Sequence, residues 1–180
     1  MERLFAVFRD KGFEGASLAD LSRATGLGRS SLYHHFPAGK EQMAEAVLAR
    51  ALAVIDEAIV GAAASPGPLK PRLRRIVATL TEMYGGGRTP CVLAQLATAG
   101  VGEGARTLLR RAFEHWVDAI MRLAAESGLP AIEARHFAED WVARLQGCLI
   151  WQAASGDAGP FDRALDTLLA LGEPSRSQLT

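Results

Sequence analysis

The hydrophobic residues of this 180-residue chain recur with the spacing of an α-helix along almost its whole length, and clusters of β-branched residues are scarce. The segment 103–126 shows the pattern best, because its large apolar residues follow one another at intervals of three or four: Leu109, Phe113, Trp116, Ile120 and Leu123. Arginines and acids occupy the opposite side, as on a helix with one face in solvent. The sequence therefore predicts an all-α fold of about nine helices.

The composition is typical of a folded cytoplasmic protein. Hydrophobic residues make up 49% of the chain and charged residues 22%, which supplies a sizeable core and excludes a disordered chain. No apolar run approaches the roughly 20 residues of a membrane span, and the N-terminal segment mixes acids and bases, unlike a secretory signal. Cys91 and Cys148 are far apart and form no CxxC motif, so we expect reduced thiols. We expect a cytoplasmic location and no membrane partner.

Start and stop signals divide the N-terminal part into short helices. Gly12 is expected to end the first helix. Ser17, followed by an acid three residues later, is typical of the N-cap of the second, which Gly26 ends. The third helix is expected over 29–35, where the sequence FPAGKE breaks it, and a longer helix over about 40–60. Two short helices joined by a turn that contains glycine form the helix-turn-helix pattern.

The stretch GAAASPGP, residues 61–68, is the clearest linker signal in the chain. It favours a small N-terminal domain of residues 1–48 and a larger helical domain of residues 49–180. Beyond the linker the apolar periodicity predicts helices over about 69–84, 92–98, 103–126, 131–155 and 161–171. The tail that follows them is expected to fray.

The segment from Leu21 to Lys40 contains bases and histidines but no acid. The whole chain has 20 basic and 20 acidic residues, so this is a local positive surface in a neutral protein. It coincides with the second helix of the helix-turn-helix pattern, the element that enters the major groove of DNA in this motif. The sequence therefore predicts binding to double-stranded DNA.

The residue types in this segment match the chemistry of DNA recognition. Arginine reads guanine edges or phosphate, serine donates to either, and tyrosine and histidine lie along the sugar-phosphate backbone. Backbone N–H groups at helix starts attract phosphate. Seven residues are candidate DNA contacts: Ser17, Arg29, Ser30, Ser31, Tyr33, His34 and Lys40. Leu32 and Phe36 are expected to point inward, and His35 either packs at the helix junction or adds a contact.

The same cluster does not predict a metal site or an active site. His34 and His35 are adjacent and point about 100° apart on a helix, without further ligands at helical spacing. The sequence YGGGRTP lacks the Gly-Lys-Ser/Thr ending of a phosphate-binding loop. No serine, histidine and acid come together on a plausible catalytic frame. We therefore expect neither enzyme activity nor a cofactor.

The larger domain carries a second cluster, of big apolar side chains with polar tips. Walls of this type are characteristic of small-molecule sites. Nine residues are candidate ligand contacts: Met83, Tyr84, Cys91, Gln95, Phe113, Trp116, Ile120, Trp151 and Gln152. Ordinary packing in a helical bundle is the competing interpretation for each of them. For Cys91 the alternatives are plain burial, a gate to the pocket or an oxidant sensor.

The sequence LQGCLIWQAA, near the end of the helix expected over 131–155, is apolar on all sides. A helix without a polar side is buried on more than one front. In a chain this short a second copy is a good candidate for the extra cover. We expect a homodimer in which the helices near 141–154 and 161–171 pack against the same pair of the partner.

The stretch GASLADLSRATGLGRSSLYHHFPAGKEQM resembles the DNA-binding signature of the TetR family of bacterial transcriptional regulators, and the resemblance covers about residues 4–50. The segments TPCVLAQLA, FEHWVDAI and QAASGDAGPFDRALDTLLAL resemble the LmrA/YxaF-like branch of that family. The resemblance implies a C-terminal bundle that holds an effector. Two departures stand out. The basic N-terminal extension of many relatives is short or missing, so a minor-groove or flanking-phosphate contact is expected to be absent. Val92 replaces the usual proline after the cysteine.

These features together predict a dimeric repressor that a small apolar effector releases from a palindromic operator. The two recognition helices are then expected roughly 34–36 Å apart, one turn of DNA. The alternative is a helical module for ligand or protein binding whose helix-turn-helix does not read DNA.

Overall fold

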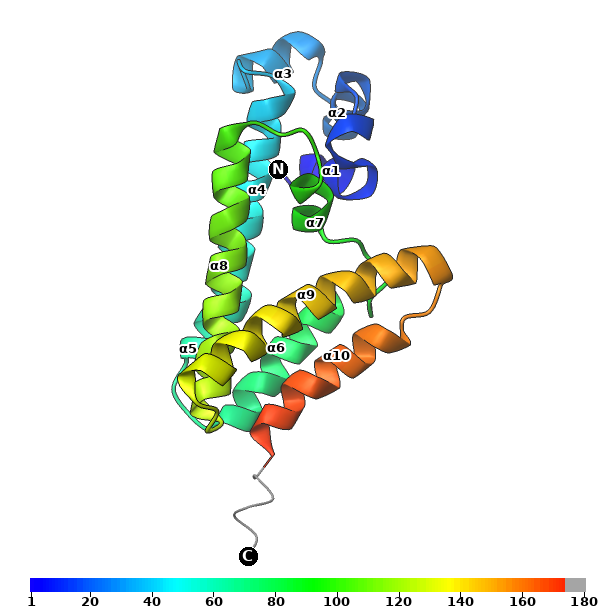
Figure 1. The fold of residues 1–180 in the computed structure, drawn as a ribbon. Helices are drawn as coiled ribbons and strands as arrows, with labels where there is room; N and C mark the ends of the chain where they lie inside the picture. The colour runs from blue at the N-terminus through cyan, green and yellow to red at the C-terminus, as the bar shows by residue number, and fades with distance from the viewer. Residues whose placement is uncertain (174–180) are drawn as a thin grey trace, which may run out of the picture. The chain divides into compact units, whose positions relative to one another are not determined.

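The computed structural model describes residues 1–173, and every regular element among them is helical (Figure 1). The α-helices are α1 (Glu2–Gly15), α2 (Leu18–Thr25), α3 (Arg29–His35), α4 (Lys40–Ile55), α5 (Gly61–Ala64), α6 (Leu69–Met83), α7 (Val92–Ala97), α8 (Glu103–Glu126), α9 (Ala131–Ser155) and α10 (Gly159–Leu169). A π-helical segment (Asp56–Val60) joins α4 to α5, and a 3-10 turn (Ala170–Gly172) follows α10. With α4 to α5 counted as one helix, the described residues form nine helices, so the all-α prediction is confirmed. The expected fraying of the tail from residue 174 lies outside the described residues.

The predicted linker at 61–68 is wrong in its first half. The helix continues through the π-helical segment to Ala64, and only residues 65–68 are not helical. Alanine is the best helix former, and Ala62 and Ala63 are buried, which offsets the helix-breaking tendency of Gly61. Arg72 on α6, itself buried, donates to the Ala63 carbonyl (2.6 Å) and so satisfies the helix end.

The sequence predicted that the first helix ends at Gly12. The structure shows an interruption there, but α1 continues to Gly15. Gly12 has a φ of 67°, a left-handed value that glycine adopts without the strain of a side chain. One more turn then runs to Gly15 and places Phe13 in the core. The bounds expected for α3, α8 and α9 agree with the structure.

The chain forms two compact units and passes between them inside α4, in the loop before α7 and inside α8. The first unit contains Met1–Val54 and Pro90–Phe113, and the second contains Ile55–Thr89 and the chain from Glu114 onward. Helix α7 and the first part of α8 therefore fold together with the N-terminal helices. Within the first unit α1 packs on α2 and on α7 (Figure 1).

The second unit contains α6, α9 and α10 together with α5 and the second half of α8. Helix α10 packs on α9 and on α6 (Figure 1). The indole Nε1 of Trp141 donates to the Ala164 carbonyl (2.7 Å) and ties α9 to α10. The fully buried Phe161 ring of α10 meets the Tyr84 ring edge-on, with centroids 6.0 Å apart. Nowhere in residues 1–173 does a helix have both the length and the apolar character to cross a membrane.

Candidate nucleic-acid interface

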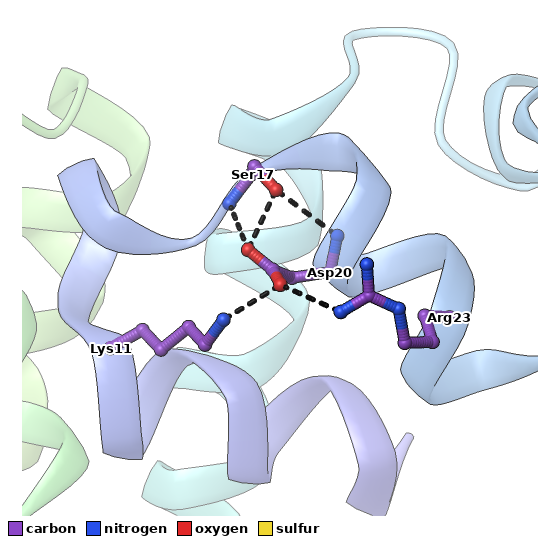
Figure 2. A network of polar contacts seen from close by, with 4 residues as sticks. All are labelled: Lys11, Ser17, Asp20 and Arg23. Carbon is purple, nitrogen blue, oxygen red and sulfur yellow. Dashed lines mark hydrogen bonds and ion pairs between the residues drawn. The ribbon is translucent and has the colours of Figure 1, made fainter.

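Helix α2 begins with a reciprocal cap. The Ser17 hydroxyl accepts from the Asp20 backbone N–H (3.1 Å), and the Asp20 carboxylate accepts from the Ser17 backbone N–H (3.2 Å) (Figure 2). The hydroxyl also donates to the same carboxylate (2.6 Å). The expected N-cap is confirmed, with an Asp in the place that Glu or Gln usually takes. The hydroxyl of Ser17, a candidate DNA contact, is thus already engaged in the cap.

Asp20 also connects α2 to α1. Lys11 Nζ lies 2.6 Å from its carboxylate, and Arg23 approaches at 3.5 Å (Figure 2). The hydrogen bond from Lys11, followed by those from Ser17, holds the pKa of Asp20 far below its usual range. The charged form of Asp20 therefore stabilises the position of α2, the helix before α3.

The depressed pKa of Asp20 predicts a pH dependence of stability. A carboxyl group with a lowered pKa in the folded state stabilises the fold above its unfolded pKa, about 3.9, and this contribution is lost as the pH falls below that value. In Asp20→Asn, the free energy of unfolding is expected to fall less between pH 6 and pH 3 than in the wild type. Urea unfolding at both pH values measures this. Asp10→Asn, which removes another surface carboxyl of the first unit, beside Arg9, is the control for the loss of one negative charge, and the change in Asp20→Asn is measured relative to it.

The turn before α3 is closed by short hydrogen bonds and one left-handed residue. Gly26 caps α2 with a φ of 74°. The Ser22 hydroxyl donates to the Leu27 carbonyl (2.6 Å), and the Thr25 hydroxyl donates to the Leu21 carbonyl (2.7 Å). These bonds fix the direction in which α3 leaves the turn.

Helix α3 has one buried residue, Leu32, which is 0% exposed as predicted. The other residues of the helix are all exposed: Arg29, Ser30, Ser31, Tyr33, His34 and His35. Phe36, the second expected anchor, is half-buried. A seven-residue helix with a single anchor presents nearly all of its polar side chains to solvent.

The aromatic residues of α3 lie at its C-terminal end. Tyr33 is 45% exposed, and its ring packs against the turn at Gly39, where a Cβ would come within 3.3 Å of the ring. The His34 and His35 rings meet edge-on, 5.5 Å apart. Because His35 is exposed, it does not pack into the helix junction, one of the two alternatives considered for it. Residues 1–173 contain no group of three or more potential metal ligands.

Lys40, the first residue of α4, has internal partners that the sequence did not indicate. Its ammonium group donates to the Phe13 carbonyl (2.9 Å) and lies 4.4 Å from the centre of the Phe13 ring. The side chain is half-buried and ties α4 to the end of α1. Only its remaining N–H donors are left for a phosphate group.

The candidate ligand contacts are divided between the two units. In the first unit Cys91 is buried and Gln95 and Phe113 are half-buried. In the second unit Tyr84, Trp116 and Ile120 are buried, Met83 and Gln152 are half-buried, and Trp151 is 55% exposed. The structure therefore does not bring Trp151 into the interior of its unit.

Some buried polar atoms of the second unit have no hydrogen-bond partner within residues 1–173: Trp116 Nε1 and both amide atoms of Gln146. Buried polar groups are usually paired, so these atoms are exceptions to the general rule. Gln146 was not among the residues predicted from the sequence. Cys148, in the same unit, is buried, and burial raises the pKa of its thiol, which makes it a weak nucleophile.

Comparison with known proteins identifies this architecture. Residues 2–47 match the family model "Bacterial regulatory proteins, tetR family", and residues 70–167 match "Transcriptional regulator LmrA/YxaF-like, C-terminal domain". The HTH-type transcriptional repressor DhaR of Mycobacterium sp. (strain GP1) is 24% identical over 189 residues, covering 100% of this chain and 93% of that protein.

Solved structures agree with the family models on the fold. A TetR transcriptional regulator from Legionella pneumophila superposes with a TM-score of 0.83 at 16% identity, covering 96% of each chain. The reduced form of E. coli NemR gives a TM-score of 0.75 at 17% identity, covering 97% of each chain. The capped helix-turn-helix, the all-helical fold and the two family matches show that this chain belongs to the TetR family of bacterial DNA-binding transcriptional regulators.

Proposed function

We propose that this protein is a repressor that binds a palindromic operator as a homodimer and is released by a small effector. Residues 1–48 bind DNA, and residues 49–180 dimerise and hold the effector. The observation that carries the proposal is the surface of α3, which is exposed, free of acids and anchored by a single buried leucine. The similar protein DhaR is a repressor, which supports the direction of control.

The exposed side chains of α3 divide into two groups by chemistry. Arg29, Ser30 and Ser31, in its first turn, read base edges or phosphate. Tyr33 and His34, in its last turn, contact the sugar-phosphate backbone. Ser17 and Lys40 flank the helix, where backbone N–H groups at the starts of α2 and α4 face phosphate.

Arg29→Ala is expected to weaken operator binding by about 1–3 kcal/mol, roughly 5- to 150-fold, because it removes a cation from the start of the recognition helix. A gel-shift or anisotropy titration with DNA flanking the gene measures this, with circular dichroism to confirm the fold. Arg111→Ala, at an exposed arginine of α8 in the same unit, is the control. If the two variants bind the operator with equal affinity, α3 is not part of the DNA interface.

Dimerisation is supported by the outer surface of α9. Ile150 and Trp151 are 65% and 55% exposed, although both are large and apolar, and they lie on the helix expected to pair with its copy. A two-fold axis would then present two α3 helices to one palindrome. Sedimentation that finds a monomer at micromolar concentration would contradict this arrangement.

The effector site is supported by Trp116, which is 0% exposed and has an indole N–H without a partner in residues 1–173. An effector that accepts this hydrogen bond would satisfy the group. Mass spectrometry of molecules retained through purification would identify such a ligand. If Trp116 lines the site, Trp116→Ala changes the response to that ligand more than it changes DNA affinity, whereas an unchanged response would assign Trp116 to the core.

A further inference from the structure

The loop between α7 and α8 is held by acidic side chains of α1 and α4, all within the first unit. The Gly100 backbone N–H donates to the Glu14 carboxylate (2.8 Å), and the Gly102 backbone N–H donates to the Glu41 carboxylate (3.1 Å). We call these two hydrogen bonds the carboxylate clasp. The residues that they join are 86 and 61 positions apart in sequence.

Both bonds of the clasp are hydrogen bonds from a backbone N–H to a carboxylate side chain. A backbone N–H that donates to an ionised carboxylate forms a stronger bond than one that donates to a neutral acceptor. Gly102 directly precedes α8, so Glu41 also lies at the positive end of that helix. The bond from Gly100 lowers the pKa of Glu14, with a smaller effect from the charge of Lys40. The lowered pKa keeps the Glu14 carboxylate charged at neutral pH, so it remains a strong acceptor for the Gly100 N–H.

The acids lie close to the backbone of the loop and of the first turn of α8. A Cβ on Gly100 would lie 3.5 Å from Glu14 Oε1 and one on Gly102 would lie 3.4 Å from Glu41 Oε2, which are ordinary van der Waals distances. At the next alternate position, a Cβ on Gly104 would overlap the Glu45 carboxylate. Of these three glycines, Gly104 is therefore the one whose lack of a side chain lets an acid of α4 approach.

The clasp lies beside the contact that fixes α4 to α1. Lys40 donates to the Phe13 carbonyl, and Phe13 and Lys40 are the chain neighbours of Glu14 and Glu41. The end of α1, the start of α4 and the α7–α8 loop therefore meet at one place. Helices α1 and α4 are also the elements that flank α2 and α3 in sequence, so their relative position sets where α3 is presented.

We propose that Glu14 and Glu41 are positioning residues, through which the α7–α8 loop holds α1 and α4 in the arrangement that presents α3 to DNA. The inference rests on the proposed function and adds its regulation. Helix α8 is a single helix from Glu103 to Glu126 that also carries Trp116. A shift of α8 when the effector binds would draw Gly102 away from Glu41 and open the clasp. The effector then acts by preferring the open state, and DNA by preferring the closed one.

The test uses three double variants of the full chain. Glu14→Ala/Glu41→Ala removes both acceptors. Glu14→Gln/Glu41→Gln removes the charges but keeps an amide oxygen that accepts the same N–H bonds. Glu103→Ala/Glu114→Ala removes two exposed acids of α8 outside the clasp and controls for the same change in the net charge of the protein. Operator affinity and hydrogen exchange of the Gly100 and Gly102 amides are measured for each, the exchange with and without operator DNA.

Relative to the control, the alanine pair should bind the operator roughly 5- to 150-fold more weakly, the range of typical site-to-site couplings, and the glutamine pair should recover part of this loss. Because linkage is reciprocal, operator DNA should slow exchange at Gly100 and Gly102 in the wild type. A merely structural role would leave that exchange unaffected by DNA.

The outcomes separate this inference from the proposed function. A wild-type protein that binds no duplex overturns both. If the wild type binds its operator and the alanine pair binds it as tightly as the control does, the clasp is overturned and the proposed function stands. The clasp is also overturned if operator DNA does not change hydrogen exchange at Gly100 and Gly102 in the wild type. If the alanine pair fails to fold, the exchange measurement on the wild type decides, because it needs no variant and exchange that operator DNA does not slow overturns the clasp.

Discussion

Leu32→Ala is expected to destabilise the first unit by about 2–5 kcal/mol and to abolish specific DNA binding. Leu32 is fully buried and is the one residue of α3 that belongs to the core. Isolated helices shorter than about 12–15 residues are marginal in water, so the seven residues of α3 depend on this anchor. The substitution removes apolar contacts and leaves a cavity beneath the helix that is proposed to read DNA.

Denaturant unfolding followed by circular dichroism measures the loss of stability, and a gel-shift with operator DNA measures the loss of binding. Ser31→Ala, at the preceding exposed position, is the matched control and should change the unfolding free energy by less than about 0.5 kcal/mol. A Leu32→Ala protein that unfolds like the control and still binds DNA would show that α3 does not depend on this anchor.

The local part of the structure was predictable because its signals lie within a few residues of one another. The apolar stripe of Leu109, Trp116 and Ile120 predicted α8 with its observed bounds. The cap of α2 was visible as a serine and an acid three residues apart, and the break at Gly12 as a lone glycine. Periodicity and capping are short-range physics, and a single sequence displays them directly.

The contacts that link these elements were not predictable, because they join residues distant in sequence. Lys40 meets Phe13 across 27 positions, and Glu14 meets Gly100 across 86. Such pairs leave no periodic trace, and glycines beside α8 indicate only a loop. The linker prediction failed for the same reason, since the Arg72 side chain that caps the Ala63 carbonyl comes from the next helix. Features that are separate along the sequence, such as the end of α1 and the loop before α8, are thus neighbours in the first unit.

Gly87→Ala is expected to destabilise the second unit by about 2–5 kcal/mol, for two independent reasons. Gly87 has a φ of 85°, and a side chain in the left-handed region costs roughly 1–2 kcal/mol. A Cβ there would also come within 2.8 Å of Cγ of the Phe161 ring. Phe161 is fully buried and the Tyr84 ring packs edge-on against it, so the ring cannot move aside freely. Overpacking of this type adds about 1–3 kcal/mol.

Gly156→Ala separates the two effects. Gly156 ends α9 with a φ of 77°, close to that of Gly87, but nothing lies within 4 Å of the position its Cβ would take. It should therefore show the backbone strain alone, about 1–2 kcal/mol, in thermal or urea unfolding. Equal losses in the two variants would mean that the Phe161 ring yields to the new methyl group. A larger loss in Gly87→Ala would locate a rigid contact between Gly87 and α10. Because α10 belongs to the proposed dimer interface, the Gly87→Ala dimer should also dissociate at a higher protein concentration than the Gly156→Ala dimer.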